Sequence, residues 1–535
     1  MNKKDLILAS IVLIFASLVY GIYYATNKQY STSFVNTQFS NKISEYLKNQ
    51  KKNNLPINLQ NEFGINFRDV IIDDIDFSDV DLTGVDFSGS TIQRSKFIRA
   101  NLQMVQFNGS IVKDCDFRDS KISFTQARNT YFQATDFTGS TLISADLSFS
   151  NLEDCGFDQT NINNTSFKSS KMARTSFDDA IISNSTFDLA DMQNSHFNKT
   201  NIDKVNAINT NFYNAKILNI KAVDSNFKAS NFGQADLTSS NFTGTYFVDC
   251  ILYATILNDV KFINSNFLGA HFYFTAFTKI NLENLIFDNV NFNNITFTGV
   301  KFNTSTFRNA IFRYCTIKDT VFNNSDFTNA EIAFSNIQTT SSQSSKFNNL
   351  ILQQTNINDF HLTGCGFNFV SANKIAADAI SMDNNSLEGT NFFNSTIRNS
   401  VIQESVLYRV AFTKSILSNL TLRNNKNSNI TLNNVDTDKC NVTPILASIL
   451  SFNSNIDNNW ALVVTNDINQ LVASKKFTNL NLSNMDLSNL DLSNSDFSNS
   501  ILRNVNFSNS NLTGCNFTGA DIKNCTMPAE AINQK

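Results

Sequence analysis

Histidine, cysteine and paired carboxylates are the residues of this chain that could do chemistry. The 535 residues include three histidines, His196, His271 and His361, and eight cysteines. Histidine and cysteine are the usual ligands of zinc, and a carboxylate beside a histidine suits acid–base catalysis. Either chemistry requires a fold that brings such side chains within a few ångströms of one another. The elements that position these residues therefore decide whether a site exists.

The dominant pattern of the sequence is a period of five residues. Every fifth residue from Phe67 to Leu422 is Phe, Leu, Ile, Val, Met or Ala, and Ser342 is the one departure. A helix requires a period near 3.6 and a flat strand a period of 2, so neither keeps such a face buried. A period of five requires a backbone that turns a corner every five residues, and the sequence therefore predicts a solenoid.

A smaller residue accompanies each apolar centre, two positions before it. This position usually holds Ser, Thr, Ala, Cys or Val, as at Ser90, Ala100 and Cys115. Residues two apart on an extended segment point to the same side, so we expect both to face inward and the other three of each five to face outward. The residue just before the centre is often Asp or Asn, as at Asp76, which suits turns and local backbone hydrogen bonds.

The centres also alternate in type. Phe77, Phe97 and Phe117 recur every twenty residues, and aliphatic centres such as Leu82 and Leu102 recur on the same spacing between them. This alternation requires an even number of sides in each coil, and two sides would enclose no core. The sequence therefore predicts four sides and twenty residues per coil.

The pattern resembles the pentapeptide repeat family, whose motif is A(D/N)LXX. Ala235-Asp236-Leu237-Thr238-Ser239 and Ala145-Asp146-Leu147-Ser148-Phe149 match this motif residue by residue. The resemblance covers residues 67–442 and 477–527, and the frequent Phe at the centre is a variation that the family allows. It implies an all-β solenoid, a right-handed quadrilateral β-helix with four pentapeptides per coil.

Placed on such a coil, the reactive residues do not converge. The three histidines precede centres and face outward on three different sides, and the cysteines all take the small inward position with no two of them twenty residues apart. We therefore expect core thiols without disulfides, no catalytic residues, no cofactor and no metal site. The carboxylates lie on the polar surface. A net charge of −4 is too balanced for a dedicated nucleic-acid binder, so we expect no nucleic-acid partner.

The N-terminus differs from the repeats. Residues 6–25 form an uncharged apolar run after Lys3 and Lys4, long enough to span a bilayer as a transmembrane helix. The alternative is a cleaved signal peptide, although no convincing cleavage site follows the run. We interpret residues 1–25 as a cytoplasmic tip and a single membrane-spanning anchor. The repeats would then lie outside the cytoplasm, on the periplasmic side.

The remaining segments follow from breaks in the period. Residues 26–66 form a juxtamembrane segment with a short amphipathic helix near 33–50, acting as a stalk or as a lid over the first coil. Residues 67–442 are the main β-helix. The period lapses over 443–476, where Thr443-Pro444 begins a helical insertion or hinge. Residues 477–527 resume the repeat with too few coils to bury a core alone, so they dock on the main array or pair with a second chain as a homodimer. Residues 528–535 are a tail.

Exposed aromatic residues provide the one surface feature above background. Folding the numbering at twenty places a set of them on a single side, as a candidate interaction face for a protein partner: Tyr213, Tyr253, Tyr273, Phe274, Tyr314, Phe334 and Phe393. The leading hypothesis is a non-catalytic, membrane-tethered bacterial scaffold or interaction rod. One alternative is a secreted or host-translocated effector that acts by binding. Another alternative, implied by the resemblance, is a DNA mimic that protects a topoisomerase. That function would require a strongly acidic chain in the cytosol.

Overall fold

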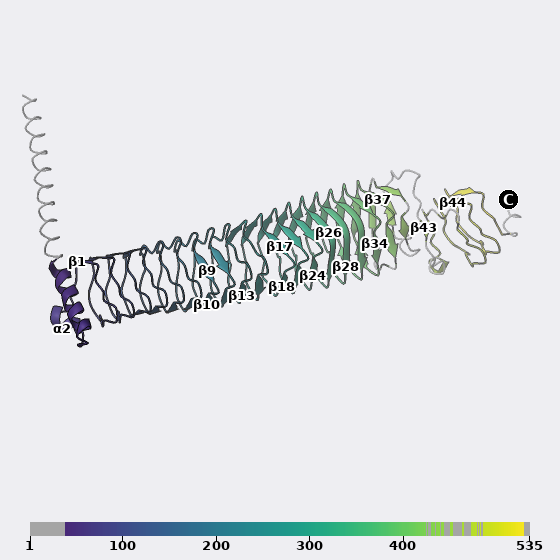
Figure 1. Ribbon diagram of the computed structural model, residues 1–535. Coiled ribbons are helices and arrows are strands. Elements are labelled where there is room, and N and C mark those ends of the chain that lie inside the picture. The colour runs from purple at the N-terminus through teal and green to yellow at the C-terminus, as the bar shows by residue number, and fades with distance from the viewer. Residues whose placement is uncertain are drawn as a thin grey trace, which may run out of the picture. The chain divides into compact units, whose positions relative to one another are not determined.

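The computed structural model describes residues 38–423, 425, 430–433, 435–438, 440–442, 450–452, 463–464, 472–478, 480, 482 and 485–528. The chain divides into two compact units, Met1–Ser240 and Asn241–Lys535. In each unit short parallel strands stack on one another, as the labelled strands of Figure 1 show. Among the described residues, no helix is both long and apolar enough to cross a bilayer. The predicted anchor, residues 6–25, lies outside the described residues.

The first unit builds its coils from three-residue strands. Paired strands are parallel and their partners are twenty residues apart, as with Ile71 and Thr91 or Lys121 and Thr141. This register confirms the predicted coil of twenty residues. The strands of this unit are Ile71–Asp73 (β1), Thr91–Gln93 (β2), Ile111–Lys113 (β3), Lys121–Ser123 (β4), Tyr131–Gln133 (β5), Thr141–Ile143 (β6), Asn161–Asn163 (β7), Ile181–Ser183 (β8), His196–Asn198 (β9), Asn201–Asp203 (β10), Lys216–Leu218 (β11) and Lys221–Val223 (β12).

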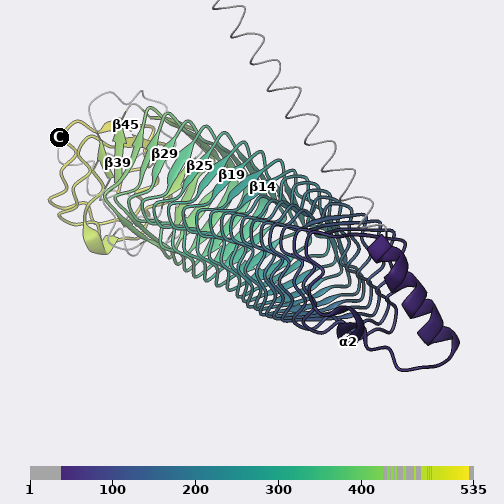
Figure 2. The same ribbon diagram turned by 90° about the vertical axis from the view of Figure 1, so that its left-hand side faces the viewer.

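The second unit contains one eleven-stranded parallel sheet, which follows one side of its coils (Figure 2). Its strands are Ile251–Tyr253 (β14), His271–Tyr273 (β16), Asn291–Asn293 (β19), Ile311–Arg313 (β22), Glu331–Ala333 (β25), Ile351–Gln353 (β27), Ser371–Asn373 (β29), Asn391–Phe393 (β32), Val410–Thr413 (β36), Ile430–Asn433 (β39) and Leu450–Phe452 (β42). Each inner strand pairs on both sides, so the middle of this sheet has no free edge.

The other strands of the second unit form the remaining sides of its coils. They are Asn241–Thr243 (β13), Lys261–Ile263 (β15), Ala276–Thr278 (β17), Asn281–Glu283 (β18), Thr296–Thr298 (β20), Lys301–Asn303 (β21), Thr316–Lys318 (β23), Val321–Asn323 (β24), Asn336–Gln343 (β26), Asn356–Thr363 (β28), Ala376–Asp383 (β30), Ser386–Glu388 (β31), Thr396–Arg398 (β33), Val401–Gln403 (β34), Val406–Tyr408 (β35), Ile416–Ser418 (β37), Thr421–Arg423 (β38), Asp436–Asp438 (β40), Asn441–Val442 (β41), Val463–Val464 (β43), Ile501–Arg503 (β44) and Asp521–Lys523 (β45).

The cores of both units are columns of stacked phenylalanines. In the first unit the rings of Phe77 and Phe97 stack at 5.0 Å between centroids, and those of Phe97 and Phe117 at 4.5 Å. In the second unit Phe307 stacks between Phe287 and Phe327, at 5.2 and 4.5 Å. Each of these side chains is at most 1% exposed. Successive rings of a column belong to successive coils, so the strand spacing of about 4.8 Å sets the distance between them.

The small inward residues are polar because the neighbouring coil satisfies them. The hydroxyl of Thr125 donates to the carbonyl oxygen of Leu102 at 2.8 Å, and that of Thr130 to the carbonyl oxygen of Phe107 at 2.6 Å. A buried hydroxyl is costly unless it is hydrogen-bonded. Each of these donors lies 23 residues after its acceptor, so the bonds join successive coils.

Two local features, which we call the first and second device, accompany the corners of the coil. The residue before a centre receives a local backbone hydrogen bond, since the Asp76 carboxylate accepts from the backbone N–H of Ser78 at 2.9 Å. The residue two after a centre adopts the left-handed conformation, with φ of 62° at Asp79 and 56° at Asn309. Asn, Asp and Gly tolerate this conformation best. The sequence analysis anticipated the first device and did not identify the second.

A helix covers the first coil of the first unit (Figure 2). It spans residues 38–52, and its side chains Ile43 and Leu47 are buried. The Phe39 ring contacts Phe67, the first repeat centre, with ring centroids 5.4 Å apart. A second short helix, Leu59–Phe63 (α2), begins after Asn58, whose side chain accepts a hydrogen bond from the backbone of Asn61. The lid alternative for the predicted helix thus fits the structure better than the stalk.

The prediction of helical structure within 443–476 is confirmed at residues 472–474, which are helical, and is wrong at Leu450–Phe452 and Val463–Val464, which are strands. Leu450–Phe452 is strand β42, which pairs with β39 in the twenty-residue register of Ile430 with Leu450. Val463–Val464 is strand β43 and pairs with β41. Pairing to the exposed edge of the preceding coil outweighs the local helical preference that follows Pro444. Residues 443–449 and 453–462 lie outside the described residues.

Ser342, the one departure from the apolar period, lies beside a cavity in the second unit. It pairs in register with Phe322 on one side and Leu362 on the other, and both of these residues line an apolar space of about 40 Å³. Its hydroxyl donates to the Phe322 carbonyl oxygen at 2.6 Å. Phe360, a large residue at a small inward position, lines the same space. The strands β26, β28 and β30 are continuous across this corner, but Thr339, Asp359 and Ala379 keep the left-handed conformation, so the predicted turn is retained.

The last repeat block has its own core. Phe477, Leu482, Leu487, Leu492 and Phe497 are fully buried, with the next coil packed against them. The final described coil is less covered: Leu512 and Phe517 are half-buried and Ile522 is 42% exposed. Docking or pairing of this block therefore stays a prediction.

Candidate interaction surface

The histidines lie apart on separate strands. His196 belongs to β9 in the first unit, and His271 and His361 belong to β16 and β28 in the second. His361 Nε2 lies 2.8 Å from the Asp359 carboxylate on an exposed surface. Among the described residues, no three His, Cys, Asp or Glu side chains are close enough to share a metal ion. The described histidines therefore provide one exposed His–Asp pair, His361 with Asp359.

The cysteines occupy the inward position, and none of the eight forms a disulfide. Cys115 and Cys315 donate hydrogen bonds to the carbonyl oxygens of Ile92 and Phe292, at 3.6 and 3.5 Å, where serine and threonine hydroxyls bond elsewhere. Burial raises the pKa of Cys115 from 9.0 to about 12. Cys515 and Cys525 differ, because they lie half-buried in the last described coils.

We expect thiol reagents to distinguish these two groups. In the native protein at pH 8 only Cys515 and Cys525 should react within minutes, since the side chains of the other six cysteines are buried. The raised pKa also means that the unfolded chain loses thiol protons before the folded chain does, so stability should fall as the pH rises from about 9 toward 12. A thiol titration with peptide mapping checks this, and rapid labelling of Cys115 would contradict it.

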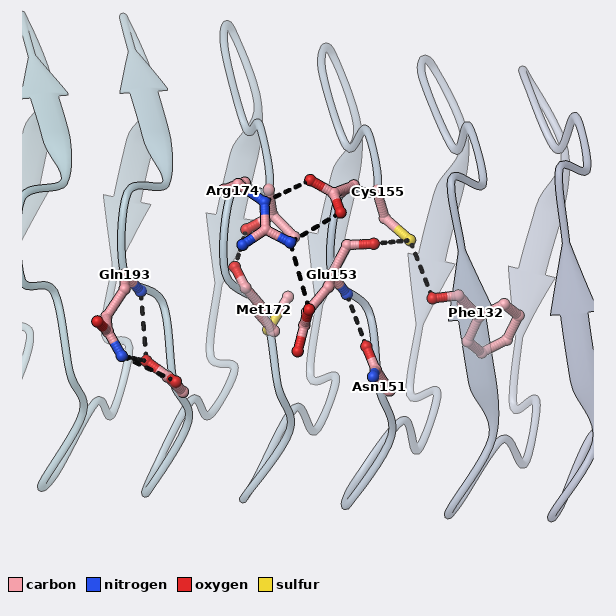
Figure 3. A network of polar contacts seen from close by, with 10 residues as sticks. Phe132, Asn151, Glu153, Cys155, Met172, Arg174 and Gln193 are labelled. Carbon is pink, nitrogen blue, oxygen red and sulfur yellow. Dashed lines mark hydrogen bonds and ion pairs between the residues drawn. The ribbon is translucent and has the colours of Figure 1, made fainter.

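Ion pairs on the first unit link neighbouring coils. The Arg174 guanidinium contacts the Asp154 carboxylate at 2.6 Å and Glu153 at 3.3 Å, both twenty or so residues earlier (Figure 3). The hydrogen bond from Arg174 holds the pKa of Asp154 below its ordinary value. All three side chains are well exposed, so such pairs contribute little net stability. They account for carboxylate pairs such as Glu153 and Asp154 without any catalytic role.

The predicted aromatic residues fall on two units. Tyr213 lies in the first unit, half-buried, with its ring edge against the backbone of Gly233. The other six lie in the second unit, on or directly beside the strands of the eleven-stranded sheet, and we call these six the aromatic face: Tyr253, Tyr273, Phe274, Tyr314, Phe334 and Phe393.

Neighbouring rings of the aromatic face contact one another. The Tyr314 and Phe334 rings stack at 5.3 Å with an interplanar angle of 19°, and Tyr253 meets Phe274 edge to face at 5.8 Å. The Lys414 ammonium lies 5.6 Å from the centroid of the Phe393 ring. Phe274 is 59% exposed and Tyr314 is 54% exposed, so much apolar surface meets solvent.

The sequence analysis missed part of this surface. Ile251 and Ile351 stand just before their centres on β14 and β27, at 44% and 46% exposure on the same side of the sheet. Both would have been found by assigning the residue before each centre to a side of the twenty-residue coil. The structure alone shows the contact of Lys414 with Phe393, because no spacing rule predicts which rotamers meet.

Family comparisons agree with the coil geometry. The model described as pentapeptide repeats, eight copies, matches residues 64–97, 223–259, 265–303, 275–313, 291–329, 476–504 and 491–527. The model described as a pentapeptide repeat region matches residues 90–167. The matched segments of the chain are therefore pentapeptide repeats. No curated protein matches it in sequence.

Solved structures similar to this chain include pentapeptide repeat proteins. Rfr23 from the cyanobacterium Cyanothece 51142 is 11% identical, with a TM-score of 0.21, over 22% of this chain and 93% of its own. QnrB1, a plasmid-mediated fluoroquinolone resistance protein, is 16% identical, with a TM-score of 0.21, over 30% of this chain and 86% of its own. HetL from the cyanobacterium Nostoc sp. strain PCC 7120 is 16% identical, with a TM-score of 0.16, over 42% of this chain and 86% of its own.

Proposed function

We propose that this chain is a non-catalytic scaffold that binds a protein partner on the aromatic face. The observation that supports the proposal is the concentration of exposed Tyr and Phe side chains on one sheet of the second unit. Tyrosine and phenylalanine are enriched at protein interfaces, because they bury a large area for few rotatable bonds. The described residues offer no competing arrangement that resembles an active site.

Replacing Tyr273, Phe274 and Tyr314 together with Ser should abolish partner capture. The three rings provide much of the exposed apolar area of the face, and a partner that covers them would lose central contacts, where truncation typically costs more than tenfold in affinity. The measurement is affinity capture from the producing cell with quantitative mass spectrometry.

The matched control for this triple variant replaces Phe124, Tyr131 and Phe149 with Ser, which are exposed aromatic residues of the first unit. This control should retain capture. Because all six side chains are at the surface, both variants should keep the circular dichroism spectrum of the parent. Unchanged capture by the aromatic-face variant would contradict the proposal.

The scaffold is, in the same proposal, tethered to a membrane through residues 6–25. Their uncharged apolar length and the preceding lysines support a single anchor with the repeats on the periplasmic side. A secreted or host-translocated effector is the alternative, and a cytosolic DNA mimic is less favoured because basic and acidic residues, 42 and 46, nearly balance. Fractionation separates these three: the producing cell's membrane, another cell's membrane, or the cytosol.

The final coil supports a second, independent proposal of self-association. Phe517 and Ile522 belong to the inward period yet remain partly exposed at the last described coil. A bare terminal coil offers apolar side chains and unpaired strand edges. Pairing of two chains through residues 477–527 would cover both.

A further inference from the structure

We propose that the partner presents an acidic amphipathic α-helix, which lies along the aromatic face across the strands of the sheet. This inference rests on the proposed function and names the chemistry of its partner. The supporting observations are the charge of the face, the orientation of its rings, its length and the pairing of its strands.

The aromatic face is nearly free of negative charge. In the outward positions of this sheet from Ile251 to Lys414 the one carboxylate is Glu331, and Arg313 pairs with it at 2.9 Å. Lys374 and Lys414 add positive charge on exposed positions. The other three sides of the same coils each carry at least three carboxylates: Asp259, Asp319, Asp359 and Asp378; Glu283, Asp383 and Glu404; Asp288, Asp326 and Glu388. An acidic partner is therefore favoured on this side alone.

One pair of rings on the face is arranged for insertion between side chains rather than for stacking on flat ligands. Tyr314 and Phe334 stand at the same position of successive coils and stack on each other, so their ring planes face along the coil stack and their edges face outward. A flat base or sugar ring requires a free aromatic face for stacking. An aliphatic side chain fits between and beside such edges. This orientation favours a protein partner over a nucleic acid.

The length and the strand pairing of the face favour a helix. From β14 to β36 the aromatic and basic residues extend over eight strand spacings, or about 38 Å. An extended peptide would need a free sheet edge to pair its backbone, and the inner strands here are already paired on both sides. A helix satisfies its own backbone hydrogen bonds, and about 25 helical residues cover this distance.

The order of side chains along the face sets the orientation of charge on the partner. Tyr253, Phe274, Tyr314 and Phe334 occupy the β14 end, and Lys374 and Lys414 lie toward the β36 end. The partner helix should therefore place apolar residues throughout the contact and its carboxylates mainly toward β36.

The test uses two synthetic peptides of 25 residues with the same leucine stripe and with either Glu or Lys on the polar face. Fluorescence anisotropy reports their binding to the full chain in nanodiscs of neutral lipid, with empty discs subtracted. The Glu peptide should bind at least tenfold more tightly than the Lys peptide. Replacing Tyr273, Phe274 and Tyr314 with Ser should remove binding of both.

Charge reversal on the face tests whether its lysines set the preference for the acidic peptide. The variant Lys374→Glu with Lys414→Glu should reverse the preference between the two peptides. The matched control, Lys261→Glu with Lys301→Glu, changes two exposed lysines with the same forty-residue separation on another side and should leave the preference unchanged.

The outcomes distinguish failure of the acidic-helix inference from failure of the proposed scaffold function. Equal binding of both peptides, an unchanged preference after Lys374 and Lys414 reversal, or tighter binding of a 25-nucleotide single strand would overturn the acidic helix. If the aromatic-face variant still loses the cellular partner in that case, the scaffold function stands. If that variant keeps the cellular partner, the scaffold function fails with it.

Discussion

Phe307→Ala should lower the free energy of unfolding of the second unit by about 3–5 kcal/mol. The Phe307 side chain is fully buried and stacks between Phe287 and Phe327, and its ring meets that of Phe302 edge to face with centroids 5.1 Å apart. Truncation removes the ring from a column whose spacing is fixed by the strands, so the neighbours cannot collapse into the space. The cost therefore lies at the upper end of the range for large-to-small core substitutions.

Urea denaturation followed by circular dichroism measures this effect. The control is Phe274→Ala, the same substitution at a side chain that is 59% exposed in the same unit. It should change stability by less than about 0.5 kcal/mol, as surface substitutions usually do. Similar losses for both variants would mean that Phe307 does not lie in a packed column.

Leu47→Asp should detach the helix of residues 38–52 from the first coil. Leu47 is 2% exposed and, with Ile43, lies on the buried side of this helix. A carboxylate at position 47 would therefore be buried without a partner. We expect a loss of several kcal/mol from the lid, and faster hydrogen exchange in the first coils than in later ones. Uncovering strand edges should also promote association of chains.

Hydrogen exchange with mass spectrometry, together with light scattering, measures both consequences. Lys48→Asp is the matched control, because Lys48 is the exposed neighbour of Leu47 on the same helix. It should leave exchange and particle size unchanged. Protection of residues 67–100 that is equal in parent and Leu47→Asp chains would show that the helix is not a lid.

The coil was predictable because each position of the repeat obeys one physical constraint. A large apolar side chain every five residues can be buried only if the backbone turns a corner every five residues, and the alternation of Phe with aliphatic centres, as at Phe77 and Leu82, indicated twenty residues per coil. The left-handed position two after each centre was not predicted, because Asn, Asp, Lys, Phe and Gly all occupy it. Here the bond to the next coil outweighs the local preference, because the left-handed Phe274 donates its backbone N–H to the Asn293 carbonyl oxygen at 3.1 Å.

Breaks in the period were harder to interpret. Leu450–Phe452 has the composition of either a buried helix or a strand, and only the pairing of Ile430 with Leu450 decides between them. Similarly, the sequence marks Ser342 as an exception, but the cavity that its register partners Phe322 and Leu362 line depends on packing across the coil.

The aromatic face was predictable in outline from periodicity alone. Folding at twenty residues placed Tyr273 and Tyr314 on one side, and the structure puts both on or beside the eleven-stranded sheet. The same procedure added Tyr213, which belongs to the first unit. Spacing does not determine side-chain rotamers. The contacts between rings and the ion pair of Arg313 with Glu331 depend on those rotamers, so the sequence did not predict them.

The most direct test of the coil is a disulfide between residues twenty apart. Thr298 and Lys318 are register partners on the adjacent strands β20 and β23, so their Cα atoms lie about one strand spacing apart, within the range that a disulfide spans. The variant Thr298→Cys with Lys318→Cys should form this bond on mild oxidation, identified by peptide mass spectrometry. The pair Thr298→Cys with Arg313→Cys, fifteen residues apart, should not. Crosslinking at fifteen residues and none at twenty would contradict the four-sided coil.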